Sequence, residues 1–306
     1  MEKYNCNFIK IDVTNTCNLS CPLCPNSYRR NKQNIPNKNI SLPEFCNFIN
    51  EIKIPPEGMG FGVNNEPLLN KDIFNMISFV NKKGITSTLF SNFTLSNTFS
   101  IEDIVNSGIK YICIGLDGID QQSYSKYRIG GNFDTVINSI KQIQEYKKQH
   151  NLEFPKIKII FIVFKHNENL TDKAEKLFTD LKIPVFFRRT DLYAGFEDWF
   201  PTNFKQTNSN EDRIPTQHTP IKAICTEPFF SVTIDAFGKV YPCCGDGAFN
   251  FSVGNIFHDS FEDIWNCEKM YNIRNVLQKK CNNILDVPCI SCPIYKQDNN
   301  NIAIKL

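Results

Sequence analysis

Six short apolar runs alternate with stretches of helical spacing, and this alternation constrains the fold more than any other feature of the sequence. The runs read as buried strands and span residues 8–13, 58–63, 85–90, 111–116, 157–164 and 183–187. Helical spacing falls between them, at residues 42–53, 71–83, 100–107, 133–150 and 169–181. Consecutive β-α units predict parallel strands with right-handed crossovers. Because a complete (β/α)8 barrel needs eight units, we expect an α/β fold based on an open or partial (β/α)6 barrel.

The last third of the chain lacks this pattern. Residues 191–224 are rich in Asn, Thr and Pro, which predicts a connector. A β-hairpin turning at residues 236–238, a helix over residues 260–279 and an irregular tail with cysteines are expected after it. We therefore predict a barrel at residues 1–190, a connector at 191–224 and a small α+β domain at 225–306.

Composition narrows the class of protein. The chain has 306 residues, of which 41% are hydrophobic and 22% charged, and its net charge is +2. These values are typical of globular proteins and give no indication of binding to nucleic acid or to a membrane surface. No apolar run is long enough to span a membrane, and the first residues lack the apolar core of a signal peptide. We therefore expect a cytoplasmic protein.

Thirteen cysteines, an odd number without a secretion signal, argue against a disulfide framework. Three of them, Cys17, Cys21 and Cys24, form a C-x3-C-x2-C motif directly after the first predicted strand. Three thiolates suit zinc or an iron–sulfur cluster. A structural zinc ion would need a fourth nearby ligand, and all four histidines lie far away in the sequence. A [4Fe–4S] cluster on three thiolates would instead keep one iron open for another ligand.

This motif, after a first strand and before a partial barrel, resembles the radical S-adenosylmethionine (SAM) enzymes. The resemblance implies that the open iron binds the amino and carboxylate groups of SAM. It also implies that SAM is cleaved to a 5′-deoxyadenosyl radical, which abstracts hydrogen from unactivated carbon.

Further positions match this family in order along the barrel. The family's G-G-E-P turn, which meets the SAM amino group, is similar to Asn64, Asn65, Glu66 and Pro67. Asn tolerates left-handed backbone better than most residues, so we expect the turn to form despite the missing glycines. The family's T-N-G resembles residues 91–93, which makes Asn92 a candidate for binding the SAM ribose.

After the fourth predicted strand, the chain resembles the family's S-L-D-G…R-x-G-G-x-F stretch. Gly115 stands in place of the serine, and Phe93 in the preceding motif replaces a glycine. Asp117 and Arg128 are kept. The resemblance makes Arg128 a candidate for pairing with the SAM carboxylate, a role that suits its planar guanidinium.

A second group of cysteines lies near the C-terminus. A hairpin flanked by Cys225 and Cys243, followed by the C-x2-C of Cys289 and Cys292, brings four thiolates together. These residues by themselves fit either zinc or an iron–sulfur cluster. The pattern resembles the twitch domain, a shortened SPASM domain, and so implies one auxiliary [4Fe–4S] cluster. Cys244 stays open as a ligand or as a catalytic thiol near the active site, and Cys281 is unassigned.

Several phrases, including CNLSCPLCPNS and EPLL, resemble the family branch that acts on sugars and nucleoside antibiotics, such as the butirosin-pathway 2-deoxy-scyllo-inosamine dehydrogenase. This resemblance implies dehydrogenation of a small polar molecule (a sugar, aminocyclitol or nucleoside-like compound). It also implies a flavodoxin- or ferredoxin-type electron donor. Candidate substrate-binding residues end the sixth strand: Arg188, Arg189, Asp191 and Tyr193.

Two alternatives stay open. The first is an epimerase or peptide modifier, in which Cys244, Cys281 or Cys113 returns hydrogen to the substrate radical. The second is a non-enzymatic iron–sulfur electron carrier or zinc-binding scaffold.

Overall fold

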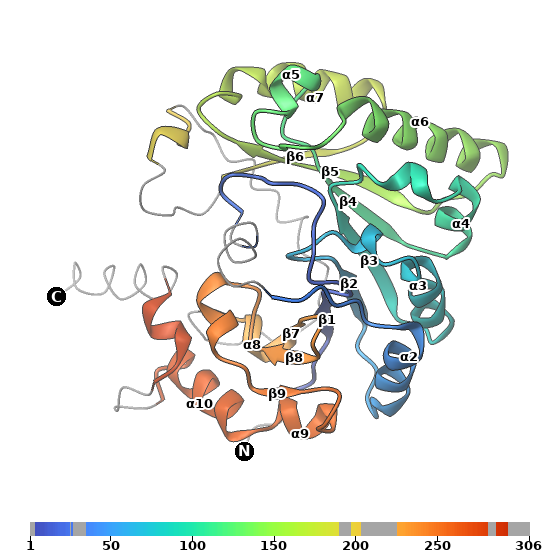
Figure 1. Cartoon of the computed structure of the whole chain (residues 1–306). Coiled ribbons are helices and arrows are strands. Elements are labelled where there is room, and N and C mark those ends of the chain that lie inside the picture. Colours follow the sequence, from blue (N-terminus) through green and yellow to red (C-terminus); the bar gives the residue numbers. More distant parts are fainter. Residues whose placement is uncertain are drawn as a thin grey trace.

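The computed structural model describes residues 4–24, 26, 35–189, 197–202, 225–280 and 286–292. Its strands form one nine-stranded sheet in the order β6-β5-β4-β3-β2-β1-β7-β8-β9 (Figure 1). From β6 to β7 every pair is parallel, whereas β7, β8 and β9 pair antiparallel. The strands are β1 (Phe8–Ile11), β2 (Gly58–Phe61), β3 (Thr86–Ser91), β4 (Tyr111–Gly115), β5 (Lys156–Val163), β6 (Val185–Arg189), β7 (Ser231–Ile234), β8 (Lys239–Tyr241) and β9 (Gly254–Asn255). The predicted α/β fold with a parallel partial barrel is confirmed.

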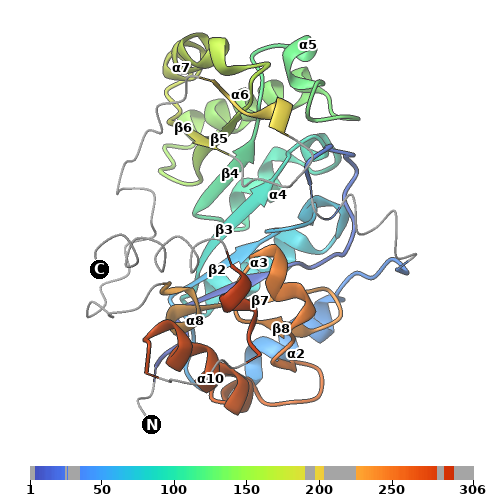
Figure 2. The same ribbon diagram turned by 90° about the vertical axis from the view of Figure 1, so that its left-hand side faces the viewer.

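Helices between the parallel strands cover one side of the sheet (Figures 1 and 2). In chain order the α-helices are α2 (Leu42–Glu51), α3 (Ile73–Lys82), α4 (Ile101–Asn106), α5 (Gln121–Tyr124), α6 (Phe133–Gln149), α7 (Thr171–Asp180), α8 (Glu227–Phe230), α9 (Phe261–Trp265) and α10 (Glu268–Leu277). Short 3-10 helices are η1 (Pro67–Leu69), η2 (Ser96–Thr98), η3 (Glu168–Leu170), η4 (Glu197–Trp199), η6 (Asp246–Asn250) and η7 (Pro288–Ser291). No helix among the described residues is both long and apolar enough to cross a bilayer.

Local sequence signals fix where the helices begin and end. Ser41 caps α2 and exchanges hydrogen bonds with Glu44, which forms the capping box that Ser-x-x-Glu predicts. Gly84 and Gly108 follow α3 and α4 with φ of +80° and +77°. Glycine favours this left-handed conformation because it has no Cβ, so both helices stop at these positions.

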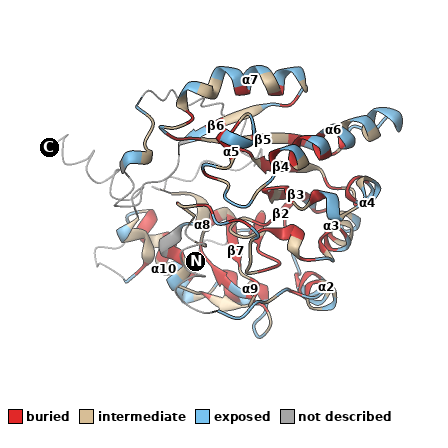
Figure 3. Ribbon diagram, turned by 45° about the horizontal axis from the view of Figure 1, so that its top comes forward, coloured by how far each residue is buried: buried red, intermediate tan, exposed pale blue. Residues whose placement is uncertain are grey.

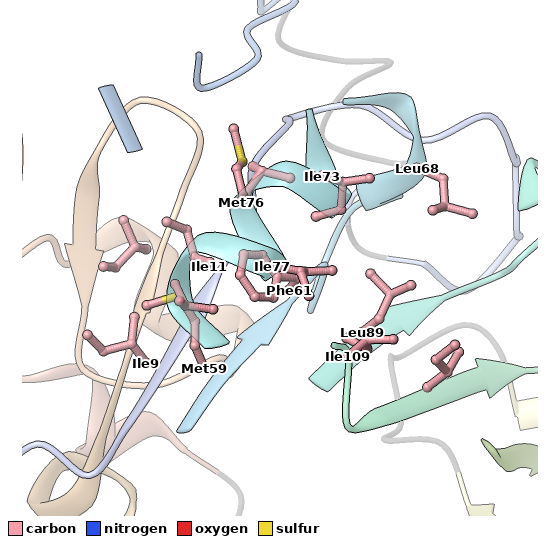
Figure 4. Packing of buried hydrophobic residues seen from close by; sticks show 14 of the residues in the cluster. Ile9, Ile11, Met59, Phe61, Leu68, Ile73, Met76, Ile77, Leu89 and Ile109 are labelled. Atoms are coloured by element: carbon pink, nitrogen blue, oxygen red, sulfur yellow. The ribbon is translucent and has the colours of Figure 1, made fainter. Parts of the chain in front are cut away.

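Alternation along the strands separates two faces of the sheet. Ile9, Ile11 and Phe61 are fully buried and face α3, where Ile73 and Ile77 pack against them (Figure 4). Figure 3 shows that buried residues gather in the central strands, whereas exposed residues lie mainly on the helices. We call the opposite side of the strands the inner face. Register and alternation place on it Phe8, Lys10, Gly58, Gly60, Thr88, Phe90, Tyr111, Cys113, Gly115, Lys158, Ile160, Ile162, Phe186 and Arg188.

Glycine on the inner face of β2 makes room for aromatic rings. A Cβ on Gly58 would lie 2.8 Å from the ring of Phe8, and one on Gly60 would lie 2.9 Å from the ring of Phe90. Both rings therefore lie directly against the backbone of β2, and they give this part of the barrel an apolar floor.

Of the predicted elements whose bounds differ from the structure, two have a cause in their local contacts. The helix expected over residues 260–279 is broken into α9 and α10, because Asn266 bonds back to Glu262 at 2.7 Å and Cys267 becomes the N-cap of α10. The strand expected from residue 183 begins at Val185, because the Ile183 N–H bonds to Phe178 at the end of α7. The strand ends at Arg189, so Arg188 and Arg189 both belong to β6.

Candidate active site

The three-cysteine motif forms a loop between β1 and α2, at the carboxyl ends of the parallel strands. Cys21 and Leu19 are buried, and Cys17 and Cys24 pack against the same small apolar cluster. Backbone N–H groups point to this loop's sulfur and oxygen atoms: Leu19 donates to Cys17 Sγ at 3.5 Å, and Cys24 donates to the Cys21 carbonyl at 3.2 Å. Burial, with the thiols of Cys24 and Cys17 nearby, raises the pKa of Cys21 to about 12, although Arg128 opposes the rise.

Asn92, at the end of β3, is brought beside this loop. Its side-chain N–H group donates to Asn18 Oδ1 at 3.0 Å and approaches Cys17 Sγ at 3.7 Å. Its Oδ1 accepts from the Thr94 hydroxyl at 2.6 Å, and Asn18 donates to the same hydroxyl at 2.8 Å. This closed network fixes the cysteine loop against β3.

Phe93 follows Asn92 with a φ of +60° and is fully buried. A left-handed backbone at this position explains why the family motif carries glycine there. In this chain, burial of the phenyl ring offsets the conformational cost.

The turn after β2 differs from the expectation that Asn64 and Asn65 adopt left-handed backbone. The left-handed residue is Gly62, with φ of +82°, where a Cβ would lie 2.4 Å from the Pro67 ring. Asp12 Oδ1, at the end of β1, accepts the N–H groups of Asn64 at 3.0 Å and Asn65 at 3.3 Å. The Asp12 carboxylate therefore fixes the backbone of this turn to the end of β1.

Three buried polar atoms of this turn lack hydrogen-bond partners within the described part of the chain: Asp12 Oδ2, Asn64 Nδ2 and Asn65 Oδ1. Burial raises the pKa of Asp12 to about 6, and the backbone N–H groups and nearby side-chain amides of the two asparagines moderate the rise. Unpaired buried polar atoms are costly, so these atoms fit a ligand with both N–H donors and an acceptor oxygen.

Glu66 is buried and fully occupied by protein donors. Its Oε1 accepts from the Ser91 hydroxyl at 2.7 Å and from Leu68 N–H at 3.1 Å, and its Oε2 accepts from Asn92 N–H at 2.8 Å. Burial raises its pKa to about 7 despite these donors. The Glu66 carboxylate thus links η1 to the end of β3.

Arg128 follows α5 in the sequence, and its guanidinium reaches back to the end of β4, beside Asp117. Its Nε donates to Asp117 Oδ2 at 2.5 Å, and Asp117 Oδ1 accepts from Ile162 N–H at 2.6 Å. Burial lowers the pKa of Arg128, but Asp117 and the nearby Cys21 raise it above its ordinary value overall. A Cβ on Gly115 would lie 2.4 Å from Arg128 Nη2. The glycine that departs from the family serine therefore makes room for the guanidinium.

An aromatic cluster that the sequence did not reveal packs against the cysteine loop. The rings of Tyr127 and Phe164 lie 4.4 Å apart, and Trp199 and His166 each lie 5.4 Å from Phe164. These residues come from three separate loops with no common spacing, so only the tertiary structure unites them. They supply aromatic bulk near Leu23, which occupies a position that is often aromatic in the family.

The four cysteines of the C-terminal group converge. Cys225 precedes α8, Cys243 follows β8, and Cys289 and Cys292 lie in and after η7. Burial, with neighbouring thiols of this group, raises the pKa of Cys243 and of Cys289 to about 12. Gly245 N–H donates to Cys243 Sγ at 3.4 Å. Coordination to a metal would remove the protons and supply the missing positive charge.

The donor chemistry of both groups fits iron–sulfur clusters, with three thiols in the loop and four in the C-terminal group. A tetrahedral zinc ion would need thiol sulfurs about 3.8 Å apart, as Zn–S bonds of about 2.3 Å require. No three His, Cys, Asp or Glu side chains are arranged to hold a single metal ion in the described ranges.

Cys244 makes different contacts from its neighbour Cys243. Its Sγ lies 3.8 Å from Nζ of Lys10, on the inner face of β1. Lys10 also pairs with the Glu227 carboxylate, which accepts from the Ser231 hydroxyl at 2.6 Å. This polar group joins the C-terminal cysteines to the inside of the barrel.

Of the remaining predicted residues, the structure describes some and not others. Arg188 is exposed on the inner face of β6. Arg189 ends the same strand, and its side chain lies outside the described residues. Asp191, Tyr193 and Cys281 also lie outside them. Cys113 lies on the inner face, opposite Phe90 on one side and Lys158 on the other.

Curated relatives match this chain at low identity. It is 24% identical over 185 residues to the Fe-coproporphyrin III synthase of Methanosarcina barkeri, which covers 60% of this chain and 44% of that protein. It is 24% identical over 226 residues to the GTP 3′,8-cyclase of Clostridium botulinum, covering 69% of this chain and 66% of that protein. The chain therefore spans less than half of the first relative and about two thirds of the second.

Solved structures share the fold. SuiB of Streptococcus suis bound to S-adenosylmethionine has a TM-score of 0.70 at 15% identity, covering 95% of this chain and 71% of that one. BtrN in complex with AdoMet and 2-DOIA has a TM-score of 0.52 at 14% identity, covering 93% and 95%. The resemblance to the sugar-pathway branch is thus only distant.

Two family matches account for the two cysteine groups. Residues 225–293 match the SPASM iron–sulfur cluster-binding domain, and residues 11–177 match the Radical SAM superfamily. The combination implies that the chain binds SAM, an iron–sulfur cluster on the three-cysteine loop, and auxiliary iron–sulfur cluster(s) in its C-terminal part. Because the second match covers more than half of the sequence, the chain belongs to the radical SAM superfamily.

Proposed function

We propose that the protein is a radical SAM dehydrogenase of a small polar substrate, such as a sugar, an aminocyclitol or a nucleoside-like compound. With SAM and both clusters bound, the cofactors supply a 5′-deoxyadenosyl radical that takes one hydrogen atom from a substrate carbon, and an acceptor for the second electron. The substrate hydroxyl or amine then loses a proton, which leaves a carbonyl or imine. A flavodoxin- or ferredoxin-type protein would deliver the starting electron.

The residues beside the three-cysteine loop are assigned to SAM. Cys17, Cys21 and Cys24 would hold the open cluster. Asn92 would face the ribose, and Arg128, positioned by Asp117, would pair with the carboxylate.

The methionine amino group is assigned to the turn after β2. Asp12 Oδ2 and Asn65 Oδ1 would accept its N–H groups, and Asn64 Nδ2 would donate to a carboxylate oxygen. The Glu66 carboxylate would support this turn without touching SAM, since three protein donors occupy it.

One observation carries the choice of dehydrogenation. Lys10, on the inner face of the barrel, approaches Cys244 at 3.8 Å, directly beside Cys243 of the second cysteine group. A cluster held by Cys225, Cys243, Cys289 and Cys292 would therefore border the substrate space. An electron leaving a substrate radical would have a short path to that cluster.

The test begins with anaerobically reconstituted protein, dithionite and SAM. We expect 5′-deoxyadenosine from the wild type and none from a Cys17→Ala/Cys21→Ala/Cys24→Ala variant. Candidate sugars, aminocyclitols and nucleosides are then screened in D2O by mass spectrometry. Dehydrogenation predicts one 5′-deoxyadenosine per product that has lost two hydrogens, with no deuterium on the reacting carbon. Absence of 5′-deoxyadenosine in every wild-type reaction would leave the non-enzymatic alternative, an iron–sulfur electron carrier or a zinc-binding scaffold.

Epimerisation, or modification of a peptide or natural product, is the second candidate. The candidate hydrogen donors among the described residues are Cys113, on the inner face of β4, and Cys244, beside Lys10. This reaction would incorporate deuterium from D2O at the inverted carbon. Such a label, lost in a Cys113→Ala or Cys244→Ala variant, would replace the dehydrogenase proposal.

A further inference from the structure

A charged pair joins the barrel to the C-terminal cysteine group. Lys10 lies on the inner face of β1, and its ammonium forms an ion pair with the Glu227 carboxylate. Glu227 stands two residues after Cys225 in the sequence, and its carboxylate also accepts from the Ser231 hydroxyl at 2.6 Å. A cation of the first strand is therefore held beside the segment that carries the first cysteine of this group.

Strand register explains why Lys10 reaches this segment. β1 pairs with β7 in parallel, with Phe8 opposite Ser231 and Lys10 opposite Thr233. Residues opposite each other in a parallel pair point to the same side of the sheet, so Ser231 and Thr233 share the inner face with Lys10. The side chain of Lys10 is only 15% exposed, and its charge is therefore little screened by water.

Lys10 also reaches the second cysteine segment. Its Nζ lies 3.8 Å from Sγ of Cys244, the residue after Cys243. Burial lowers the pKa of this lysine, but Glu227 and the cysteines Cys244 and Cys243 raise it above its ordinary value overall. Burial raises the pKa of Cys225, and the Glu227 N–H and the Lys10 ammonium oppose that rise. One cation thus acts on cysteines that lie on either side of the β7–β8 hairpin.

We propose that Lys10 raises the reduction potential of the auxiliary cluster held by the C-terminal cysteine group. Reduction adds negative charge to a cluster on four thiolates, so a fixed cation beside it stabilises the reduced form. The proposal rests on the proposed function for its purpose, since a higher potential favours transfer of one electron from the substrate radical to the cluster. The radical loses a proton in the same oxidation and becomes the carbonyl or imine.

The auxiliary cluster is studied by itself in the full-length Cys17→Ala/Cys21→Ala/Cys24→Ala protein, in which about four irons per chain should remain. Its midpoint potential is measured by a redox titration followed by electron paramagnetic resonance, without SAM or substrate. We expect Lys10→Met to lower the equilibrium constant for reduction at least about tenfold, which is about 59 mV for one electron. Glu227→Gln keeps an oxygen acceptor for Lys10 but loses a negative charge, so it should raise the potential. This second shift should be smaller, because the Glu227 side chain is 45% exposed.

Two further variants separate charge from packing. Lys10→Arg keeps the positive charge and should keep the wild-type potential. Lys158→Met is the matched control, because Lys158 shares the inner face but lies on β5, four strands from β1. Its Nζ lies 5.7 Å from the centre of the Tyr111 ring and 5.4 Å from that of the Phe186 ring, away from the cysteines. Loss of this cation should leave the potential unchanged.

An unchanged potential in Lys10→Met, or an equal fall in Lys10→Met and Lys10→Arg, would overturn the proposal. Absence of iron from the triple-alanine protein would overturn it as well, because the C-terminal cysteines would then hold no cluster. Circular dichroism of each variant excludes misfolding. Production of 5′-deoxyadenosine is measured for each substitution with all native cysteines present, so that failure of the radical chemistry is seen separately from failure of this proposal.

Discussion

Asp12 Oδ1 accepts a hydrogen bond from the backbone N–H of Asn64 at 3.0 Å, and this bond ties the end of β1 to the turn after β2. We expect Asp12→Asn to weaken SAM binding about tenfold, because the variant loses the charge and one acceptor of the site. Equilibrium dialysis of labelled SAM on reconstituted protein measures this loss. Asp180→Asn, at the end of the outer helix α7, is the control.

Asp12 also predicts a pH dependence of SAM binding. Burial raises its pKa to about 6, so the carboxylate becomes protonated as the pH falls through that value. Wild-type affinity should therefore decline between pH 7 and pH 5.5, whereas the affinity of Asp12→Asn should stay nearly constant over this range. A parallel decline in both proteins would contradict a role for this carboxylate.

Glu66 distinguishes a structural carboxylate from a SAM ligand. Glu66→Gln replaces one oxygen by an N–H donor that must face an existing donor, either Asn92 N–H or Ser91 and Leu68. We expect unfolding of the cluster-free protein in urea to require about 1–3 kcal/mol less free energy. Unchanged stability with weaker SAM binding would show instead that Glu66 acts as a ligand. Glu102→Gln, in the first turn of α4, is the matched control.

Cys243 and Cys244 should behave differently although they are neighbours. Cys243→Ala removes a member of the four-thiol group, so iron should fall from about eight to about four per chain. Cys244→Ala should keep about eight, because this thiol contacts Lys10 instead. Iron analysis and absorption spectra of the reconstituted proteins provide the measurement. Iron loss in the Cys244 variant alone would exchange the two assignments.

Gly115 tests the packing of Arg128. Gly115→Ser restores the family residue, but its Cβ would lie 2.4 Å from Arg128 Nη2, which is too close without a shift of the guanidinium. We expect a loss of about 1–3 kcal/mol of stability from overpacking, together with weaker SAM binding as the guanidinium moves. Urea unfolding and SAM dialysis measure the two effects. A fully stable variant with wild-type SAM affinity would contradict this account of the glycine.

Much of the fold could be predicted because its signals are local. Apolar runs, the Ser41–Glu44 capping box and the glycines after α3 and α4 each act within a few residues. The β-α repeat then leaves few topologies for parallel strands. The break between α9 and α10 does not show in the apolar periodicity, because it is made by the Asn266 side chain bonding back to the Glu262 carbonyl. Cys267, whose Sγ approaches the Val253 carbonyl at 3.6 Å, then becomes the N-cap of α10.

Only those residues of the candidate site that belong to a sequence motif could be predicted. The cysteines, Asn92, Asp117 and Arg128 are found by their order along the chain. Their division into ligands, SAM contacts and substrate contacts stays a prediction, as do the domain boundaries and the cytoplasmic location. Asp12 and the Tyr127–Phe164–Trp199 cluster have no sequence signature, because their roles depend on which loops meet above the sheet.

The sequence alone identified the family, because a C-x3-C-x2-C motif directly after a first strand resembles that of the radical SAM enzymes and is recognisable without the fold. Only the tertiary structure joined β7 to β1 in one sheet and turned Lys10 toward Cys244. It also occupied Glu66 with protein donors and held Lys158 between two rings. The physical reason is that spacing along a chain fixes local chemistry, whereas strand register decides which distant side chains share one face.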